Sequence, residues 1–201
     1  MIKNIVFDMG NVLIKYEPEL FLDRAGIFDA QERELLMTNI FHSSGWREMD
    51  AGTLDEEGLY QRAIKVLPSR FHDLAHELIF SWSEPLIPVD GMYELVRWCH
   101  EKDLGIYLLS NASVRQPLYW QTIPIKHYFR GVVVSAFEKC MKPEARLYEI
   151  LLNRYSLKAE ECLFIDDSKL NVEGAKAVGM KGWLFENDPE ELQKYISELI
   201  Q

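Results

Sequence analysis

The sequence predicts an α/β protein, with a parallel sheet covered by helices on both faces and a small helical segment inserted after the first strand. From residue 90 onward, short apolar runs alternate with amphipathic helical patterns, which is typical of βαβ units. Between residues 16 and 85 the chain instead carries charged, aromatic and amphipathic segments with little strand patterning. This contrast predicts a sheet domain interrupted by a helical insertion.

The strands are expected at apolar runs bounded by polar or turn residues, which lie at residues 2–8, 104–109, 131–135, 162–165 and 181–185. Helices with one apolar face are expected around residues 92–99, 147–155 and 192–199, and another helix should follow Asp167 and end near Gly179. In the inserted segment, Thr53-Leu54-Asp55-Glu56 reads as a capping box, which predicts a helix from about Leu54 towards Val66.

Composition narrows the classes of partner. Lysine and arginine number 22 against 32 aspartates and glutamates, a net charge of −10, which disfavours nucleic acid and anionic membrane as ligands. The three cysteines, Cys99, Cys140 and Cys162, are widely spaced and fit a reducing compartment. No segment approaches the roughly 20 apolar residues that span a bilayer. We therefore expect a cytoplasmic protein without a membrane partner, either a monomer or a homodimer.

Polar residues stand where the predicted strands end. Because parallel strands place their carboxyl ends at one edge of the sheet, where ligands bind, these residues are expected to converge. They are Asp8 after the first strand, Ser110 and Asn111 after the second, Lys142 before Pro143, and Asp166 and Asp167 after the fourth. Three carboxylates, a hydroxyl and an ammonium at one edge are the groups that phosphoryl transfer needs.

The chemistry of each group supports this interpretation. Carboxylate oxygens without soft ligands favour Mg²⁺, which keeps several waters and bridges to phosphate oxygens. Lys142 would balance charge on the phosphate and on the attacking carboxylate, and Ser110 with the neighbouring backbone N–H groups would hold phosphate oxygens. An aspartate such as Asp8 would then attack phosphorus, and water would hydrolyse the resulting aspartyl-phosphate.

Four segments resemble, in order, the sequence motifs of the haloacid dehalogenase-like hydrolases: residues 7–13 (Phe-Asp-Met-Gly-Asn-Val-Leu), 109–111, 142–143 and 164–167. The resemblance implies a Rossmann-like core formed by residues 1–15 and 86–201, and a helical cap domain formed by residues 16–85.

The same resemblance implies roles for individual residues. Asp8 would be the nucleophile and a metal ligand, and Lys142 would assist catalysis. Ser110, Asn111 and Lys142 would bind a small-molecule phosphate ester. The backbone carbonyl of Gly10 would be a second metal ligand. Asp167 would bind Mg²⁺ directly, with Asp166 acting through water or beside the ligands.

The sequence departs from that pattern at Gly10, where most phosphatases of the superfamily have an aspartate that serves as general acid and base. A missing acid/base costs about 10²–10⁴ in rate, so three alternatives stay open. The protein is a phosphatase whose proton comes from elsewhere, a metal-free 2-haloacid dehalogenase, or a non-catalytic phosphate-binding or regulatory protein. The Asp166-Asp167 pair disfavours the dehalogenase, because a haloacid carboxylate gains nothing from two further negative charges.

The Asp-x-Gly-Asn-Val form at residues 8–12 also resembles a branch that includes glucose-1-phosphatase-like enzymes. An anomeric oxygen leaves more readily than an alcohol oxygen and depends less on an acid, which makes a sugar phosphate a candidate substrate. In the insertion, Gly45-Trp46-Arg47 is a candidate contact to the substrate, and Trp120 and Tyr128 are further candidates in the core. His72 and His76 share a helix face but lack a zinc-hydrolase motif, and are expected on a solvated helix.

Overall fold

The computed structural model describes residues 1–82 and 84–200 of the chain. Its sheet has five parallel strands in the order β3-β2-β1-β4-β5. The strands are β1 (Asn4–Phe7), β2 (Gly105–Ser110), β3 (Gly131–Val134), β4 (Cys162–Asp166) and β5 (Lys181–Leu184). Each of the predicted strands is therefore present within a few residues of its expected range, and the predicted α/β class is confirmed.

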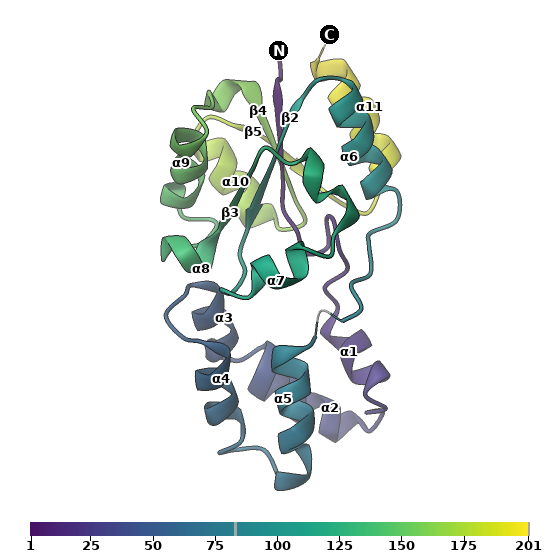
Figure 1. Cartoon of the computed structure of the whole chain (residues 1–201), viewed down its shortest axis with the longest axis vertical. Helices are drawn as coiled ribbons and strands as arrows, with labels where there is room; N and C mark the ends of the chain where they lie inside the picture. Colours follow the sequence, from purple (N-terminus) through teal and green to yellow (C-terminus); the bar gives the residue numbers. More distant parts are fainter. Residues whose placement is uncertain (83, 201) are drawn as a thin grey trace.

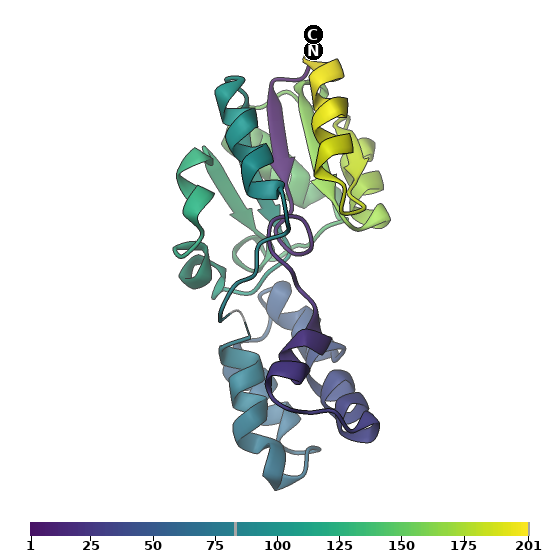
Figure 2. The same cartoon turned by 90° about the vertical axis from the view of Figure 1, so that its right-hand side faces the viewer.

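Helices cover both faces of the sheet (Figure 1). On one face, α6 (Met92–Glu101) and α11 (Pro189–Leu199) lie side by side, as Figure 2 shows. On the other face, α9 (Ala145–Arg154) and α10 (Lys169–Ala177) pack against the alternate residues of β1, β2 and β4. The apolar stripe predicted on residues 92–99 is buried against the sheet. Shorter segments complete this part: α7 (Gln116–Trp120), η3 (Pro124–Tyr128), α8 (Ser135–Glu138) and η4 (Ala159–Glu161).

Between β1 and α6 the chain leaves the sheet and forms a helical insert at its carboxyl edge (Figure 1). The insert contains α1 (Pro18–Arg24), α2 (Ala30–Leu36), η1 (Met37–Phe41), α3 (Ser44–Asp50), α4 (Glu56–Ala63), η2 (Ser69–Phe71) and α5 (His72–Phe80). It has an apolar core of its own, which includes Leu22, Ile40, Leu59 and Ile79. The helical cap region expected from the sequence is therefore present, and residues 16–85 remain its proposed extent.

One local prediction in the insert was wrong. The N-cap of α4 is Asp55 rather than Thr53, because the Asp55 carboxylate accepts a hydrogen bond of 2.8 Å from the Gly58 N–H. The Thr53 hydroxyl instead donates to the Glu48 carbonyl, at 3.2 Å. As a result α4 begins at Glu56 and ends at Ala63, which makes it shorter than the capping box indicated.

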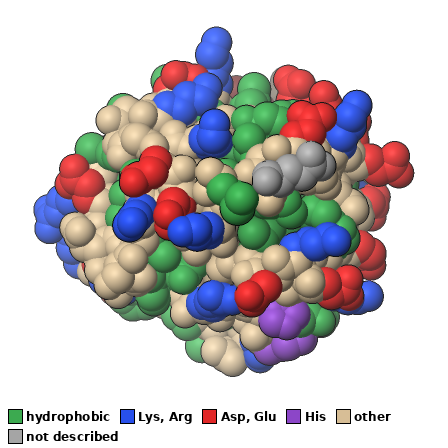
Figure 3. All heavy atoms as spheres, turned by 90° about the horizontal axis from the view of Figure 1, so that it is seen from above, with side chains coloured by type: hydrophobic (Ala, Val, Ile, Leu, Met, Phe, Trp, Pro, Cys, Tyr) green, Lys and Arg blue, Asp and Glu red, His purple; other side chains and the backbone are tan. Residues whose placement is uncertain are grey.

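Both chain termini lie at the end of the molecule opposite the insert, and Figure 3 looks onto that end. Basic and acidic side chains of the described residues are interspersed there. The three cysteines are buried and unpaired within the described residues. Among the helices of residues 1–82 and 84–200, none combines the length and the apolar character that crossing a bilayer requires.

Candidate active site

The strand register aligns the residues that the sequence placed at strand ends. Phe7, the last residue of β1, pairs with Leu108 in β2 and with Ile165 in β4. Because these strands are parallel and nearly in step, Asp8, Ser110 and Asp166 reach the same edge of the sheet. The convergence that the sequence predicted is therefore found in the structure.

At the centre of this edge, Lys142 bridges two carboxylates. Its Nζ lies 2.7 Å from Asp8 Oδ1 and 2.7 Å from Asp166 Oδ2. All three side chains are buried, with 1% of the Lys142 side chain, 12% of the Asp8 side chain and none of the Asp166 side chain exposed. A buried ion pair of this kind is stabilising only when the geometry is close and the charges are otherwise hydrogen-bonded, as here.

The two adjacent aspartates differ in their surroundings. Asp166 also accepts hydrogen bonds from the Ser168 N–H (2.8 Å) and from Asn171 Nδ2 (3.0 Å and 3.1 Å). Asp167 is exposed and receives a hydrogen bond of 3.2 Å from Asn11 Nδ2. Of the two aspartates, Asp167 therefore has the carboxylate that is more available to bind a metal ion.

The donor set fits a hard divalent cation. Asp8, Asp166 and Asp167 each place a carboxylate oxygen within 4.8 Å of the other two. Lys142 supplies one positive charge against these three carboxylates, so the cluster has an excess of negative charge that a cation would neutralise. Oxygen ligands without sulfur or imidazole are the set that Mg²⁺ prefers.

The same charges shift the pKa values of Asp8 and Lys142. Burial raises the pKa of Asp8 to about 7, with Lys142 opposing the rise and Asp166 adding to it. Burial alone lowers the pKa of Lys142, but the negative charges of Asp8 and Asp166 outweigh it and leave that pKa raised. Lys142 therefore stays an ammonium, and Asp8 is the carboxyl whose charge depends on its neighbours.

The turn after β1 is held by Asn11, which adopts a left-handed conformation with φ of 54°. Asparagine tolerates this region better than most residues, because its short amide hydrogen-bonds locally. Its Oδ1 accepts the Tyr16 N–H (2.9 Å), while its amide nitrogen reaches Asp167. Gly10, beside it, needs no left-handed backbone, and a Cβ there would lie 3.5 Å from that of Tyr16, an ordinary contact.

Asn111, which the sequence suggested for substrate binding, is engaged with the backbone of Lys142. Its Oδ1 accepts the Lys142 N–H (2.9 Å), and its Nδ2 donates to the Lys142 carbonyl (3.0 Å). Ser110 is buried at the end of β2 and faces the cavity described next. Both residues lie at the expected edge, and Asn111 also positions the lysine.

A cavity of about 810 Å³ opens between this edge and the insert. On the sheet side its lining includes Asp8, Gly10, Ser110, Asn111 and Asp167, whereas Lys142 and Asp166 are buried outside the lining. The insert supplies mostly apolar and aromatic side chains, among them Tyr16, Phe41, Trp46, Met49, Ile79, Phe80 and Trp82. If the reacting group of a substrate lies at the sheet edge, the rest of that substrate would be enclosed by the insert.

Of the aromatic and histidine residues that the sequence analysis considered, some line the cavity and others do not. Trp46 lines it, whereas Arg47 is exposed and outside the lining. Trp120 packs in the core below the sheet edge, and its neighbour Tyr119 faces the cavity instead. His76 stacks on Phe80 with ring centroids 4.3 Å apart. Tyr128 and His72 likewise lie outside the lining, with Tyr128 packed on His100 and His127, and the His72 Nε2 3.1 Å from the Leu67 carbonyl.

The lining residues that the sequence analysis missed include Asp50, Glu56, Arg115 and Tyr119. Two of them are acids carried by the insert, at the end of α3 and the start of α4. Little in the sequence indicated the role of Glu56, because an acid in the first turn of a helix is ordinarily a solvated residue. In the structure Glu56 is buried. Only the packing of the insert on the sheet shows that both face the site.

A family model described as haloacid dehalogenase-like hydrolase matches residues 2–179. The chain belongs to that family and is therefore an enzyme of the hydrolase class. It is 28% identical over 187 residues to a sesquiterpene phosphatase of Aspergillus oryzae, covering 90% of this chain and 88% of the relative. A phosphorylated carbohydrates phosphatase of Thermotoga maritima is 25% identical over 185 residues, covering 88% and 82%.

Solved structures share the fold at lower identity. A haloacid dehalogenase family enzyme of Bacteroides thetaiotaomicron, an asp12ala mutant in complex with magnesium and inorganic phosphate, superposes with a TM-score of 0.68 at 22% identity, covering 96% of this chain and 99% of that one. The L-2-haloacid dehalogenase of Xanthobacter autotrophicus superposes with a TM-score of 0.69 at 16% identity, covering 100% and 85%. The fold thus occurs in a protein that binds magnesium and inorganic phosphate and in a haloacid dehalogenase, so the fold alone does not define the chemistry.

Proposed function

We propose that this protein is a Mg²⁺-dependent phosphatase that hydrolyses a small phosphorylated metabolite through an aspartyl-phosphate on Asp8. One observation carries the proposal: the carboxylates of Asp8, Asp166 and Asp167 lie together at the open edge of the sheet, and the Lys142 ammonium bridges the first two. Within the described residues the three cysteines are buried free thiols, which fits the reducing cytoplasm as the compartment.

Each residue has a defined task in the reaction. The Asp8 carboxylate attacks phosphorus while the phosphorus–oxygen bond to the leaving group breaks. Lys142 holds Asp8 in place and balances its charge, and the Ser110 hydroxyl would donate a hydrogen bond to a phosphate oxygen. Asp8, Asp167 and the Gly10 carbonyl would hold Mg²⁺, with Asp166 beside them, and the cation would draw charge from the phosphate oxygens. Water then attacks the aspartyl-phosphate and releases phosphate.

The alternatives fit the site less well. A haloacid carries its own carboxylate, which would meet Asp8, Asp166 and Asp167 with one ammonium among them, and like charges at close range repel. A protein that only binds phosphate has no need of a carboxylate held 2.7 Å from a buried lysine and open to the cavity. Both alternatives have distinct outcomes in the experiment below.

The test is turnover of a panel of phosphate esters with Mg²⁺, against Asp8→Asn as control. The panel should include sugar 1-phosphates, primary-alcohol phosphates and esters with bulky apolar alcohols, because the insert lines the cavity mostly with apolar and aromatic side chains. We expect phosphate release that stops on chelation of Mg²⁺ and is absent in the control. Chloride release from 2-chloropropionate without Mg²⁺ would identify a dehalogenase, and no turnover above the control would identify a binding protein.

Among the panel, a sugar phosphate is the proposed substrate class. The anomeric oxygen is a good leaving group, and the Thermotoga relative bears the name of a carbohydrate phosphatase. Faster cleavage of primary-alcohol phosphates than of sugar 1-phosphates would contradict this assignment while leaving the phosphatase itself intact.

A further inference from the structure

Asp50, the last residue of α3, is brought to the active site by a direct contact between the insert and the sheet edge. Its backbone carbonyl accepts a hydrogen bond of 2.5 Å from Ser135 Oγ. The same Ser135 oxygen accepts the Ala112 N–H at 3.0 Å, and Ala112 directly follows Ser110 and Asn111. The position of Asp50 is therefore tied to the loop that follows β2 at the edge of the proposed phosphate site.

Two further contacts hold the insert against the same loop. Ser113 Oγ donates to Glu56 Oε1 at 2.6 Å, and Arg115 Nη2 donates to the Phe80 carbonyl at 3.0 Å. Together with the Ser135 contact they fix the insert over the site at the ends of α3, α4 and α5. Asp50 is thus carried by a docked element, so its place in the cavity does not depend on a loop closing.

The carboxylate of Asp50 differs from the other acids that line the cavity. Within the described residues it accepts no hydrogen bond, whereas Glu56 is engaged by Ser113. Glu84 also lines the cavity but is exposed, and Asp8 and Asp167 belong to the metal and nucleophile group. Asp50 is therefore the lining acid that is both shielded by protein and uncommitted to a partner.

Its surroundings favour the protonated form. Burial raises the pKa of Asp50 to about 7, the charge of Glu56 from α4 adds to the rise, and the charge of Lys142 opposes it. Tyr16 and Tyr119 also face Asp50, but burial and nearby negative charges raise the pKa of both phenols, so each holds its proton tightly. A carboxyl that exchanges its proton near neutral pH suits acid/base work.

We propose that Asp50 is the catalytic acid and base of this enzyme, acting from the insert in place of a residue at position 10. The inference rests on the proposed phosphatase function. As Asp8 Oδ bonds to phosphorus, the ester bond breaks and the leaving oxygen takes the proton of the Asp50 carboxyl. Water then attacks the aspartyl-phosphate, the bond from phosphorus to Asp8 breaks, and the proton of that water returns to Asp50.

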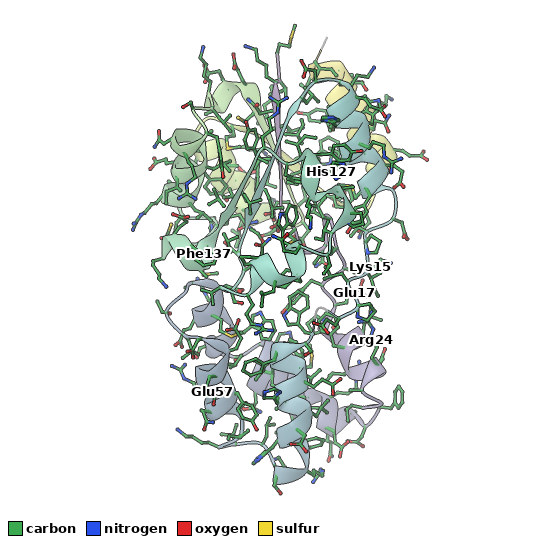
Figure 4. All side chains as sticks on the ribbon, viewed as in Figure 1. Lys15, Glu17, Arg24, Glu57, His127 and Phe137 are labelled. Atoms are coloured by element: carbon green, nitrogen blue, oxygen red, sulfur yellow. The ribbon has the colours of Figure 1, made fainter. Side chains whose placement is uncertain are left out.

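The experiment compares two esters of similar shape, phenyl phosphate and para-nitrophenyl phosphate, with wild type and Asp50→Asn. The nitro group stabilises the leaving phenolate, so that ester needs no proton from the enzyme, whereas phenyl phosphate gains from one. Asp50→Glu keeps the carboxyl, and Glu57→Gln removes an exposed acid of α4 that bonds only Gln61 among the described residues (2.8 Å; Figure 4). Thermal unfolding confirms that each variant is folded.

We expect Asp50→Asn to lower kcat/KM for phenyl phosphate by about 10²–10⁴-fold and for para-nitrophenyl phosphate by less than about tenfold. Asp50→Glu should recover part of the loss, and Glu57→Gln should match wild type on both esters. An equal loss on both esters would assign Asp50 a structural role and overturn the proposal, as would an unchanged rate on phenyl phosphate. A wild type inactive on both esters and on the wider panel would overturn the phosphatase assignment itself.

Discussion

The Asn111 side chain clamps the backbone of Lys142 on both sides, with Oδ1 accepting its N–H (2.9 Å) and Nδ2 donating to its carbonyl (3.0 Å). These residues come from separate loops, 31 positions apart in the chain. Through this clamp, the loop after β2 sets the position of the ammonium that bridges Asp8 and Asp166.

Asn111→Ala is therefore expected to lower kcat by about 10²-fold, because a displacement of about 1 Å at a reacting group has that effect. KM should change little, since the loss concerns the alignment of Lys142 with Asp8. Steady-state kinetics measure the split. Asn39→Ala is the matched control, because it removes an amide-to-carbonyl bond (2.8 Å) inside the insert and should leave kcat unchanged. A rise in KM alone would instead indicate that Asn111 binds the substrate.

Asp166 and Asp167 should respond differently to removal of their charge. Asp167→Asn should weaken Mg²⁺ binding by about 10–100-fold with little change in unfolding free energy, because its carboxylate is exposed and bonded to Asn11. Asp166→Asn should cost about 3 kcal/mol of stability, because it leaves Lys142 with one fewer buried partner. Isothermal titration with Mg²⁺ and urea unfolding measure the two quantities. Equal effects of both variants on Mg²⁺ binding would contradict the division of roles.

Asp50 should make the stability of the protein depend on pH. Since burial raises its pKa from 3.8 to about 7, the folded state disfavours the charged form. The stability that depends on a protonated Asp50 carboxyl is fully present below pH 3.8 and is lost as pH rises to about 7. Asp50→Asn stays neutral, so it should match wild type near pH 4 and exceed it by up to about 4 kcal/mol at pH 8. Urea unfolding across this range, with Mg²⁺ chelated, tests the sign; a variant less stable than wild type at pH 8 would contradict it.

The contact between Ser113 and Glu56 should contribute to docking of the insert. Ser113→Ala leaves the buried Glu56 carboxylate without its hydroxyl donor, which should cost about 1.5–3 kcal/mol. Glu56→Gln in the same background should cost less than it does in wild type, with a coupling of about 1 kcal/mol in a double-mutant cycle. Additive effects would show that the contact contributes nothing to stability.

Much of the fold follows from local pattern. Apolar runs at the five strands and amphipathic stripes such as that of Met92, Leu95 and Val96 predict the sheet and its covering helices because burial dominates both. The error at the start of α4 has a local cause as well. Both Thr53 and Asp55 are good N-cap residues, and what decides between them is the Thr53 hydrogen bond to the carbonyl of Glu48 in the preceding helix, α3.

The sequence by itself determined which residues meet at the sheet edge, because parallel strands carry whatever follows them to a common edge. Asp8, Ser110 and Asp166 needed no further information. Only the tertiary structure decided that Asp50 faces the site and that Tyr119, rather than Trp120, lines the cavity. Those positions depend on how the insert and α7 dock, through contacts such as Ser135 to Asp50 between residues 85 positions apart. No local periodicity encodes the direction in which a docked helix presents its last side chain.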